Sequence, residues 1–409
     1  MKVLFLSQIV PYPPHGGVLQ RGFNLLRELG RSASVHLLAF IHPDVLPTAE
    51  SLEESRRVLG GFCEKVEYFP LWPKASRAHV LAALAASACS SAPFSVIAHR
   101  SKAFQQRVSG ALKTDRFDLL HVDTIALGQF ASGNGVPTVL THHNIESMLM
   151  ERRAQVEQRP FARQFLQRET RKLQSYEGTM SPAFDINILM SEHDEKTLLD
   201  RVPGVRTAVV PNGVDVDYFS PDPDGETPAM IYTGGMNMFA NRDAVMYFLN
   251  EIWPRIVQNT PDVRFFAVGQ DPPKELAALA AKDPRVIVTG YVNDIRPFVR
   301  QAAVYVVPLR VGGGTRLKVL DAMAMGKALV STSIGCEGID VRHGEHLIVA
   351  DTPETFAQSV STLLDDRTKR RTLGGAARTL VEQRYAWRVV GCQLLDAYRK
   401  AMDTGRRAR

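Results

Sequence analysis

The stretch that decides the fold reads Val311-Gly312-Gly313-Gly314-Thr315-Arg316-Leu317-Lys318-Val319-Leu320-Asp321-Ala322-Met323-Ala324-Met325-Gly326, and it follows an apolar run over residues 302–308. The apolar run predicts a buried strand, and the spacing after the glycines predicts a helix that ends at Gly326. Glycines between a strand and a helix leave backbone N–H groups uncovered at the positive end of the helix, which suits a phosphate. Arg316 and Lys318 place cations where the helix alone disfavours them, so we expect an anionic ligand.

This glycine turn is not one of the common nucleotide motifs. It lacks the Gly-x-x-x-x-Gly-Lys-Ser/Thr of a P-loop and the Gly-x-Gly-x-x-Gly of a dinucleotide site. A solvated basic turn on an ordinary α/β protein therefore stays open as the alternative.

Length and composition are those of a globular protein. The chain of 409 residues suits two domains, because single cores stop growing at about 250–300 residues. The net charge of +6 fits anionic small molecules or an anionic membrane surface and does not demand nucleic acid, for which we find no motif. The 4 cysteines are scattered without metal-type spacing, so we expect reduced thiols and no metal site.

Short apolar runs alternate with helical patterns, which predicts an α/β protein with parallel sheets covered on both faces. The predicted strands are residues 2–7, 35–40, 119–122, 138–141, 186–190 and 207–210, and then 230–232, 263–268, 286–288, 304–307 and 328–331. A Pro-Asn-Gly turn and a polar, Pro-rich linker at 220–228 separate the two series. We expect Rossmann-like domains over 1–205 and 206–380, with a helical segment at 381–409 that crosses back onto the first.

Short motifs follow the predicted strands in a fixed order. They are Pro11-Tyr12-Pro13-Pro14-His15-Gly16-Gly17, Leu120-His121-Val122-Asp123, Thr141-His142-His143-Asn144, Pro211-Asn212-Gly213-Val214-Asp215, Tyr232-Thr233-Gly234-Gly235 and Thr289-Gly290-Tyr291-Val292. Together with the opening stretch, their order resembles glycosyltransferase family 4 over nearly the whole chain, and especially its members in exopolysaccharide gene systems. The resemblance implies a GT-B fold, in which two Rossmann-like domains face each other across a cleft. It also implies a retaining hexosyltransferase with a nucleotide-diphosphate sugar as donor, a saccharide or polyprenyl-linked acceptor and no metal.

The resemblance assigns catalytic roles on both domains. Arg316 and Lys318 are expected to clamp the diphosphate of the leaving nucleotide. Asp123 stands where many relatives have a second histidine, and it either accepts the proton of the acceptor or orients a sugar hydroxyl; in such enzymes the donor phosphate itself can take that proton. In those relatives that histidine lies by the reacting sugar. His143 belongs to the His-His-Asn trio that ends the next predicted strand, which is either structural or functional, and it is our other candidate catalytic residue in the first domain. The expected substrate contacts are Gly16, Gly17, His142, Asn144, Gly234, Tyr291, Val292, Gly313, Gly314, Thr315 and, for the ribose, Asp321.

The chain also departs from the family pattern. Gly313 stands where relatives carry the first of two glutamates, so the donor sugar is not implied by the resemblance. The loop after the strand at 230–232 lacks the lysine that many members have there, and its Arg242 comes late, so we interpret Arg242 as a surface charge. We interpret Glu146, Glu192 and Asp194 as ordinary acids of a first helical turn.

Two other functions remain open: a nucleotide-sugar 2-epimerase of the same fold, and a nucleotide-sugar-binding protein without catalysis. The N-terminus shows no signal-peptide pattern and no run reaches about 20 apolar residues, so we expect a cytoplasmic protein, or one that is peripheral on the inner face of the membrane. The apolar segment 79–86, flanked by Lys74 and Arg77, is either a core helix or a helix on the membrane surface.

Overall fold

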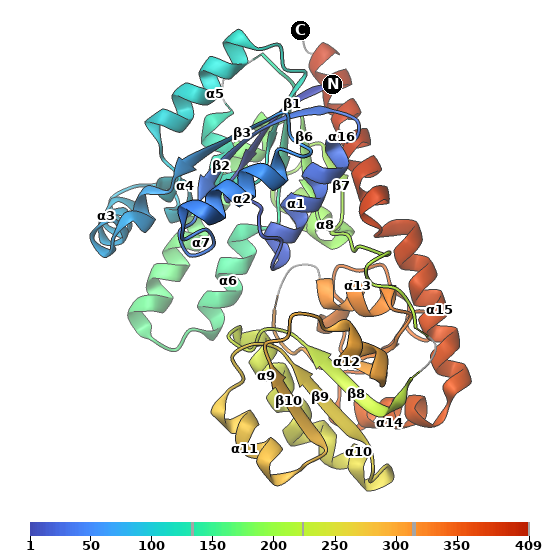
Figure 1. Cartoon of the computed structure of the whole chain (residues 1–409). Helices are drawn as coiled ribbons and strands as arrows, with labels where there is room; N and C mark the ends of the chain where they lie inside the picture. Colours follow the sequence, from blue (N-terminus) through green and yellow to red (C-terminus); the bar gives the residue numbers. More distant parts are fainter. Residues whose placement is uncertain (132–134, 223–224, 313–315, 408–409) are drawn as a thin grey trace. The chain divides into compact units, whose positions relative to one another are not determined.

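The computed structural model describes residues 1–131, 135–222, 225–312 and 316–407, and the chain divides into two compact units. The first unit comprises Met1–Pro211 and Val390–Arg409, and the second comprises Asn212–Val389. The boundary between the units therefore lies after Pro211, beyond the expected boundary at residue 205. The C-terminal segment that belongs to the first unit begins at Val390, not at the expected residue 381. Helix α16 (Trp387–Arg407) starts in the second unit and continues in the first (Figure 1).

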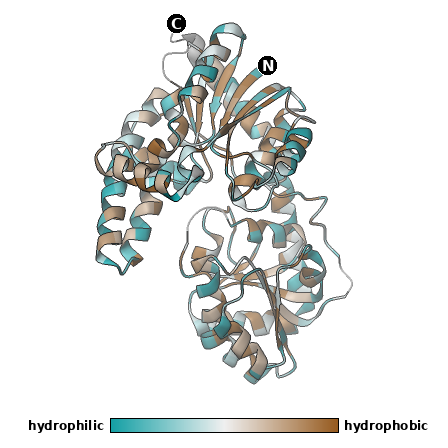
Figure 2. Ribbon diagram, turned by 60° about the vertical axis from the view of Figure 1, so that its left-hand side comes forward, coloured by the Kyte–Doolittle hydropathy of each residue, from teal (hydrophilic) through white to brown (hydrophobic). Residues whose placement is uncertain are grey.

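The first unit is built on a parallel sheet with the strand order β3-β2-β1-β4-β5-β6-β7. Its strands are β1 (Lys2–Ser7), β2 (Ser34–Ile41), β3 (Lys65–Pro70), β4 (Leu119–Val122), β5 (Thr138–Thr141), β6 (Ile186–Leu189) and β7 (Thr207–Val209). Its helices are α1 (Gly17–Leu29), α2 (Ala49–Leu59), α3 (Arg77–Ala88), α4 (Phe94–Ala98), α5 (Lys102–Thr114), α6 (Glu146–Val156), α7 (Pro160–Met180) and α8 (Glu192–Arg201). Its strands are largely brown in Figure 2, because their apolar side chains are buried on both faces.

The second unit repeats this plan with the parallel strand order β10-β9-β8-β11-β12-β13. Its strands are β8 (Thr227–Thr233), β9 (Arg264–Val268), β10 (Val286–Gly290), β11 (Ala302–Val307), β12 (Ala328–Ser331) and β13 (Ile348–Val349). Its helices are α9 (Phe239–Tyr247), α10 (Trp253–Asn259), α11 (Lys274–Lys282), α12 (Arg296–Gln301), α13 (Leu317–Ala324), α14 (Pro353–Asp365) and α15 (Arg367–Arg384).

Each sheet has one point where the strand order reverses: between β1 and β4 in the first unit, and between β8 and β11 in the second. In open parallel sheets, ligands bind beyond the carboxyl ends of the strands at such a switch point. The loops that leave β1 and β4 lead to Gly16 and Asp123, and those that leave β8 and β11 lead to Gly234 and Arg316. The fold thus gives each unit a place for a ligand, and the predicted site residues follow these four strands.

Two strands were missed by the sequence analysis. Strand β3 mixes charged and apolar residues and is only partly buried, because it forms the edge of the first sheet, so it lacks the continuous apolar run of an inner strand. Strand β13 spans only Ile348–Val349 and is too short to show a pattern.

The interpretation of segment 79–86 as a core helix is wrong. Residues 77–88 form helix α3, which buries only Ala83 and Ser87 and leaves Leu81 67% exposed. Polar contacts hold its C-terminal end: Lys172 of α7 donates to the backbone oxygen of Ser87, and Glu169 accepts from the Ser87 hydroxyl.

Candidate functional site

Asp123 lies at the switch point of the first sheet, directly after β4, and its side chain is buried. Its Oδ1 lies 3.2 Å from Nε2 of His143 and 3.8 Å from Nε2 of His121. Burial raises the pKa of this carboxyl, but the two imidazoles outweigh burial and hold the pKa well below its usual range. Apart from these imidazole nitrogens, neither carboxylate oxygen has a hydrogen-bond partner among the described residues. A buried carboxylate with lone pairs left over can accept a hydrogen bond from a ligand hydroxyl.

His121 fixes Asp123 from the core side. Its ring stacks on Phe5 with centroids 4.2 Å apart, and its Nε2 lies 3.0 Å from the hydroxyl of Thr141. Its Nδ1 lies 2.7 Å from the hydroxyl of Tyr398, which α16 brings in from 277 positions away. Burial lowers the pKa of His121, so its ring is neutral at physiological pH. Because Nε2 faces the anionic Asp123, this nitrogen carries the proton, and Tyr398 donates to Nδ1.

His143 closes the other side of Asp123. Its side chain is 11% exposed, against 1% for Asp123 and 0% for His121, so it is the member of this trio that solvent reaches most. Since Nε2 faces the carboxylate, Nδ1 is turned away from it and toward the edge of the site. This placement can position a polar ligand over Asp123 or shield the carboxylate from water.

Arg21 of α1 ties this site to the chain segment that ends the first unit. The guanidinium is buried and donates to the backbone oxygens of Pro211 and Val210 at 2.7 and 2.8 Å. Burial lowers its pKa to about 10, while the charge of Asp123 acts in the opposite direction, so Arg21 stays charged at neutral pH. The role of Arg21 could not be predicted from the sequence, because its partners are backbone atoms far along the chain.

The two histidines after β5 have different surroundings. His142 is buried, its Nε2 lies 3.0 Å from Oδ1 of Asn187, and burial lowers its pKa to about 4. It therefore packs inside the first unit, whereas its neighbour His143 meets Asp123. Asn144 follows them in the loop before α6 and is half-buried. Gly16 is the N-cap of α1, with a φ of 90°, and Gly17 is the first residue of that helix.

Glu146 belongs to this neighbourhood although sequence analysis gave it only a helix-end role. It does open α6, as expected, and its Oε1 accepts a hydrogen bond of 3.2 Å from Thr124, the residue after Asp123. Burial and the nearby Glu177 raise the pKa of Glu146. The contact could not be read from the sequence, because Thr124 and Glu146 leave different strands.

Lys318 lies at the switch point of the second sheet. Its Nζ donates to the hydroxyl of Tyr232 at 2.9 Å and to Oδ1 of Asn241 at 2.8 Å. Burial lowers its pKa to about 7, and the charge of Arg316 acts in the same direction. The ammonium lies so close to the β8 loop that a Cβ on Gly234, whose φ is 153°, would come within 2.6 Å of Nζ. Gly234 therefore admits the lysine, and the lysine joins the β8 loop to α13.

Arg316 is the N-cap residue of α13, and its side chain is 9% exposed. Its Nε donates to the backbone oxygen of Ile334 at 3.3 Å, and Nη2 lies 3.8 Å from Oε2 of Glu337. Gly312, with a φ of 138°, lets the guanidinium lie against the backbone, since a Cβ there would be 3.0 Å from Nη1. The start of α13 thus presents a cation and uncapped N–H groups, which together suit a phosphate.

Asp321 follows one turn later on α13. Burial raises the pKa of this carboxyl to about 7, while the ammonium of Lys318 acts in the opposite direction. The predicted contacts Gly313, Gly314 and Thr315 lie outside the described residues, so the structure places only the two ends of their loop. Arg242 is exposed in the first turn of α9, in keeping with a surface charge.

Apolar side chains stand exposed in the loops beyond the carboxyl ends of the second sheet. Tyr291 is 67% exposed after β10, and Val292 beside it is half-buried. Met238 is 60% exposed after β8, Phe239 opens α9 at 58%, and Ile334 is 37% exposed after β12. Sequence analysis selected Tyr291 and Val292 but missed the others, because their apolar character alone does not distinguish them from core residues. Exposed aromatic faces at this edge fit a flat ring such as a nucleobase.

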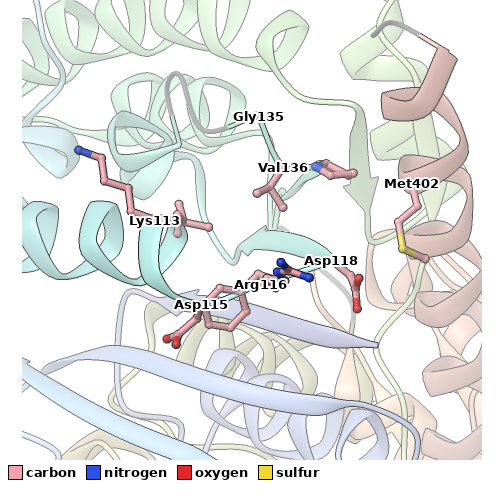
Figure 3. A pocket seen from close by; sticks show the side chains of 10 residues that line it. Lys113, Asp115, Arg116, Asp118, Gly135, Val136 and Met402 are labelled. Carbon is pink, nitrogen blue, oxygen red and sulfur yellow. The ribbon is translucent and has the colours of Figure 1, made fainter.

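A cavity of about 390 Å³ opens at the opposite, amino edge of the first sheet (Figure 3). It is lined by residues that precede β4 and β5 and by Met402 of α16, and its charged lining residues are Lys113, Asp115, Arg116 and Asp118. Because Asp123 follows the other end of β4, this cavity is separate from the switch point. In the described part of the chain, no group of three or more His, Cys, Asp or Glu residues is arranged to hold a metal ion. The described helices also include none long and apolar enough to cross a membrane.

Solved structures with the same fold cover almost the whole chain. Sucrose-phosphate synthase from Thermosynechococcus elongatus superposes with a TM-score of 0.67 at 17% identity, over 98% of both chains. Anabaena HepE in complex with UDP superposes with a TM-score of 0.66 at 16% identity, over 97% of this chain and 99% of that one. The fold is therefore that of the GT-B glycosyltransferases, as expected.

Sequence comparisons define the family. The family model described as Glycosyltransferase Family 4 matches residues 15–218, and that described as Glycosyl transferases group 1 matches residues 227–366. The chain belongs to glycosyltransferase family 4. It is 28% identical over 211 residues to the phosphatidyl-myo-inositol mannosyltransferase of Mycobacterium tuberculosis, which is 48% of this chain and 54% of the relative. It is 23% identical over 163 residues to an uncharacterized 44.6 kDa protein in the cps region of Klebsiella pneumoniae, which is 38% of this chain and 42% of the relative. The chain thus spans about half the length of the relatives that it matches in sequence.

Proposed function

We propose that the protein is a retaining glycosyltransferase that moves a hexosyl group from a nucleotide-diphosphate sugar to a saccharide or lipid-linked acceptor. The observation that carries the proposal is the buried, charged Asp123, held between two imidazoles at the switch point of the first sheet. The family supports sugar transfer. The name of one relative, a phosphatidyl-myo-inositol mannosyltransferase, supports a lipid-linked acceptor. We further propose that the product is an exopolysaccharide or another cell-envelope glycan, made on the inner face of the membrane.

We assign the leaving diphosphate to the second unit. As the bond from the anomeric carbon to the phosphate oxygen breaks, the nucleotide diphosphate leaves with the electron pair. Arg316 and the start of α13 can stabilise this growing charge without a metal, and Lys318 lies within the same turn. Asp321 can accept from a ribose hydroxyl, and the exposed Tyr291 can stack on the base. We expect transfer to continue in the presence of a chelator.

We assign the acceptor hydroxyl to the first unit. The acceptor oxygen attacks the anomeric carbon and gives up its proton, either to a phosphate oxygen of the leaving group or to a protein group. A carboxylate with a strongly lowered pKa binds a proton weakly at neutral pH, so Asp123 suits orienting a sugar hydroxyl better than holding the proton. His143 covers this carboxylate, and His142 supports β5 from the core.

The test is an assay of the purified protein with UDP- and GDP-hexoses and a panel of saccharide and polyprenyl-phosphate acceptors, followed by NMR of the product. A glycoside with the anomeric configuration of the donor supports the proposal. A free epimeric sugar formed without any acceptor identifies the 2-epimerase instead. Nucleotide-sugar binding without any turnover across the panel identifies a binding protein, and both of these results overturn the transferase.

A further inference from the structure

Helices α6 and α7 form a hairpin that begins at the site of the first sheet. Helix α6 starts at Glu146, three residues after His143, and packs along α7. Helix α7 has 21 residues and spans about 31 Å, whereas the 4 residues of β5 span about 13 Å. Because α7 is more than twice as long as β5, it extends past the end of the sheet. The first half of α7 packs against α6, and the hairpin projects beyond the sheet (Figure 1).

The base of the hairpin is rigidly fixed. The backbone N–H of Ser147 donates to Oε1 of Glu177 at 3.0 Å, and the Ser147 hydroxyl donates to the other oxygen of the same carboxylate. Arg201 of α8 donates to that hydroxyl at 2.7 Å. Ser147 and Glu177 are buried, so this network holds the first turn of α6 against α7 and α8. The base of the hairpin is therefore anchored to the first unit.

The end of the hairpin exposes large apolar side chains. Val156 is 62% exposed, Phe161 is 89% exposed and Phe165 is 37% exposed. Phe161 and Phe165 are four residues apart in α7 and so lie on the same face of the helix. Val156 ends α6 directly before the turn. Three such side chains around one turn form an apolar patch that folding of this chain leaves uncovered.

The chain around this patch is rich in arginine. Residues 151–171 contain six arginines, at positions 152, 153, 159, 163, 168 and 171, against Glu151, Glu157 and the buried Glu169. Of these, Arg159 pairs with Glu157, and Arg168 donates to the backbone oxygen of Ala88. Arg163 stands in the first turn of α7, beside the positive end of the helix dipole, and that turn carries no acidic residue. Cations in that position are unfavourable for the helix alone, and an anionic partner would remove the cost.

We propose that the end of the α6–α7 hairpin docks on an anionic lipid bilayer, with Val156, Phe161 and Phe165 among the acyl chains and the arginines on the head groups. Apolar insertion combined with screened attraction to anionic lipid is how peripheral proteins bind membranes. The choice of a lipid surface rests on the proposed function, since a lipid-linked acceptor must be met at a membrane. Docking itself requires no catalysis, so the two proposals fail separately.

The test is flotation of the full chain with phosphatidylcholine vesicles, with and without phosphatidylglycerol, at low and high salt. We expect binding that needs the anionic lipid and weakens with salt. The double variant Phe161→Ser/Phe165→Ser should lose at least about tenfold in partitioning, and Arg153→Gln/Arg163→Gln should lose the dependence on anionic lipid. Leu199→Ser, which changes a 36% exposed leucine on α8, is the matched control and should bind as the parent does.

Unchanged melting curves establish that the variants are folded, because the mutated side chains are exposed. The proposal is overturned if the double phenylalanine variant floats like the parent. It is overturned as well if the control Leu199→Ser loses as much flotation as that variant. It is also overturned if Leu81→Ser on α3 alone abolishes flotation, because the contact then lies on α3. Transfer to a soluble acceptor should be the same for the parent and the hairpin variants. If flotation fails while such transfer persists, the proposed function stands without the hairpin contact.

Discussion

The two switch points share a topology but carry opposite chemistry. In the first unit, a carboxylate is held between two imidazoles, and its pKa lies below its usual range despite burial. In the second unit, the Lys318 ammonium contacts neutral oxygens of Tyr232 and Asn241, and its pKa is lowered to about 7. The comparison shows that the first site keeps its charge without a ligand, whereas the second is incompletely charged until an anion arrives. This difference fits a first unit that orients an acceptor and a second unit that binds a diphosphate.

The largest expected effect is on turnover by the first site. Asp123→Asn keeps the shape of the side chain and removes the charge that orients the sugar hydroxyl, so kcat should fall by about 100-fold. The affinity for free nucleoside diphosphate should not change, because that ligand is assigned to the second unit. Initial rates and calorimetry on the same preparation measure both quantities.

The matched control is Asp118→Asn, at the other end of β4, where the carboxylate accepts from the backbone N–H of Lys2. It should leave kcat within about twofold, as expected of a surface change. If Asp123→Asn turns over at the rate of the parent protein, the first site has no part in the chemistry.

The second prediction concerns ligand binding by the second unit. Arg316→Ala should remove a charge-assisted contact worth about 1.5–3 kcal/mol, which weakens the binding of a nucleoside diphosphate by roughly 10- to 150-fold. Arg242→Ala, which removes an exposed arginine on α9, is the control and should bind like the parent. Calorimetry with UDP and GDP decides, and equal affinities for the parent and a folded Arg316→Ala protein would reject the clamp.

A smaller effect tests how the first site is held. Tyr398→Phe deletes the hydroxyl that meets Nδ1 of His121 at 2.7 Å, a bond worth about 0.5–1.5 kcal/mol. Without it His121 can change tautomer and turn away from Asp123, so kcat should fall roughly 2- to 10-fold at constant KM. Tyr176→Phe is the control, since that buried hydroxyl has no hydrogen-bond partner among the described residues. An equal fall in both variants would show a general packing effect.

The smallest expected effect is the uptake of a proton at the second site when the diphosphate binds. With a pKa of about 7, Lys318 is mostly neutral at pH 8, and a bound diphosphate favours its charged form. Binding at pH 8 should therefore take up a proton, approaching one per site, and the uptake should disappear well below pH 7. Calorimetry in buffers of different ionisation enthalpy measures it. Lys318→Met should abolish the uptake, while Asp321→Asn should keep it; uptake that survives in Lys318→Met comes from another group.

The sequence predicted the inner parts of the fold well and the contacts between distant residues poorly. Strands β1, β4, β5 and β12 have the predicted bounds, because buried parallel strands are continuous apolar runs. Both adjacent histidines after β5 were expected at the substrate, and only the packed structure shows that one ring faces Asn187 and the other faces Asp123.

At both sites, local features could be predicted and contacts between distant residues could not. The phosphate site was predicted from local features, a glycine turn before a helix with two cations, and these are visible in one stretch of sequence. The partners of its lysine, Tyr232 and Asn241, lie 86 and 77 positions away. The link from Tyr398 to His121 joins residues 277 positions apart. No spacing rule connects such pairs, because they depend on how β8 and α16 pack.

The central claim is that the switch point of the second sheet binds the diphosphate of the donor. A crystal structure of the protein with a nucleoside diphosphate tests it most directly. The account predicts phosphate oxygens at the start of α13, within hydrogen-bond distance of Arg316, with the base near Tyr291. A diphosphate bound at Gly16 and the start of α1, or in the cavity at Lys113 and Arg116, would contradict it.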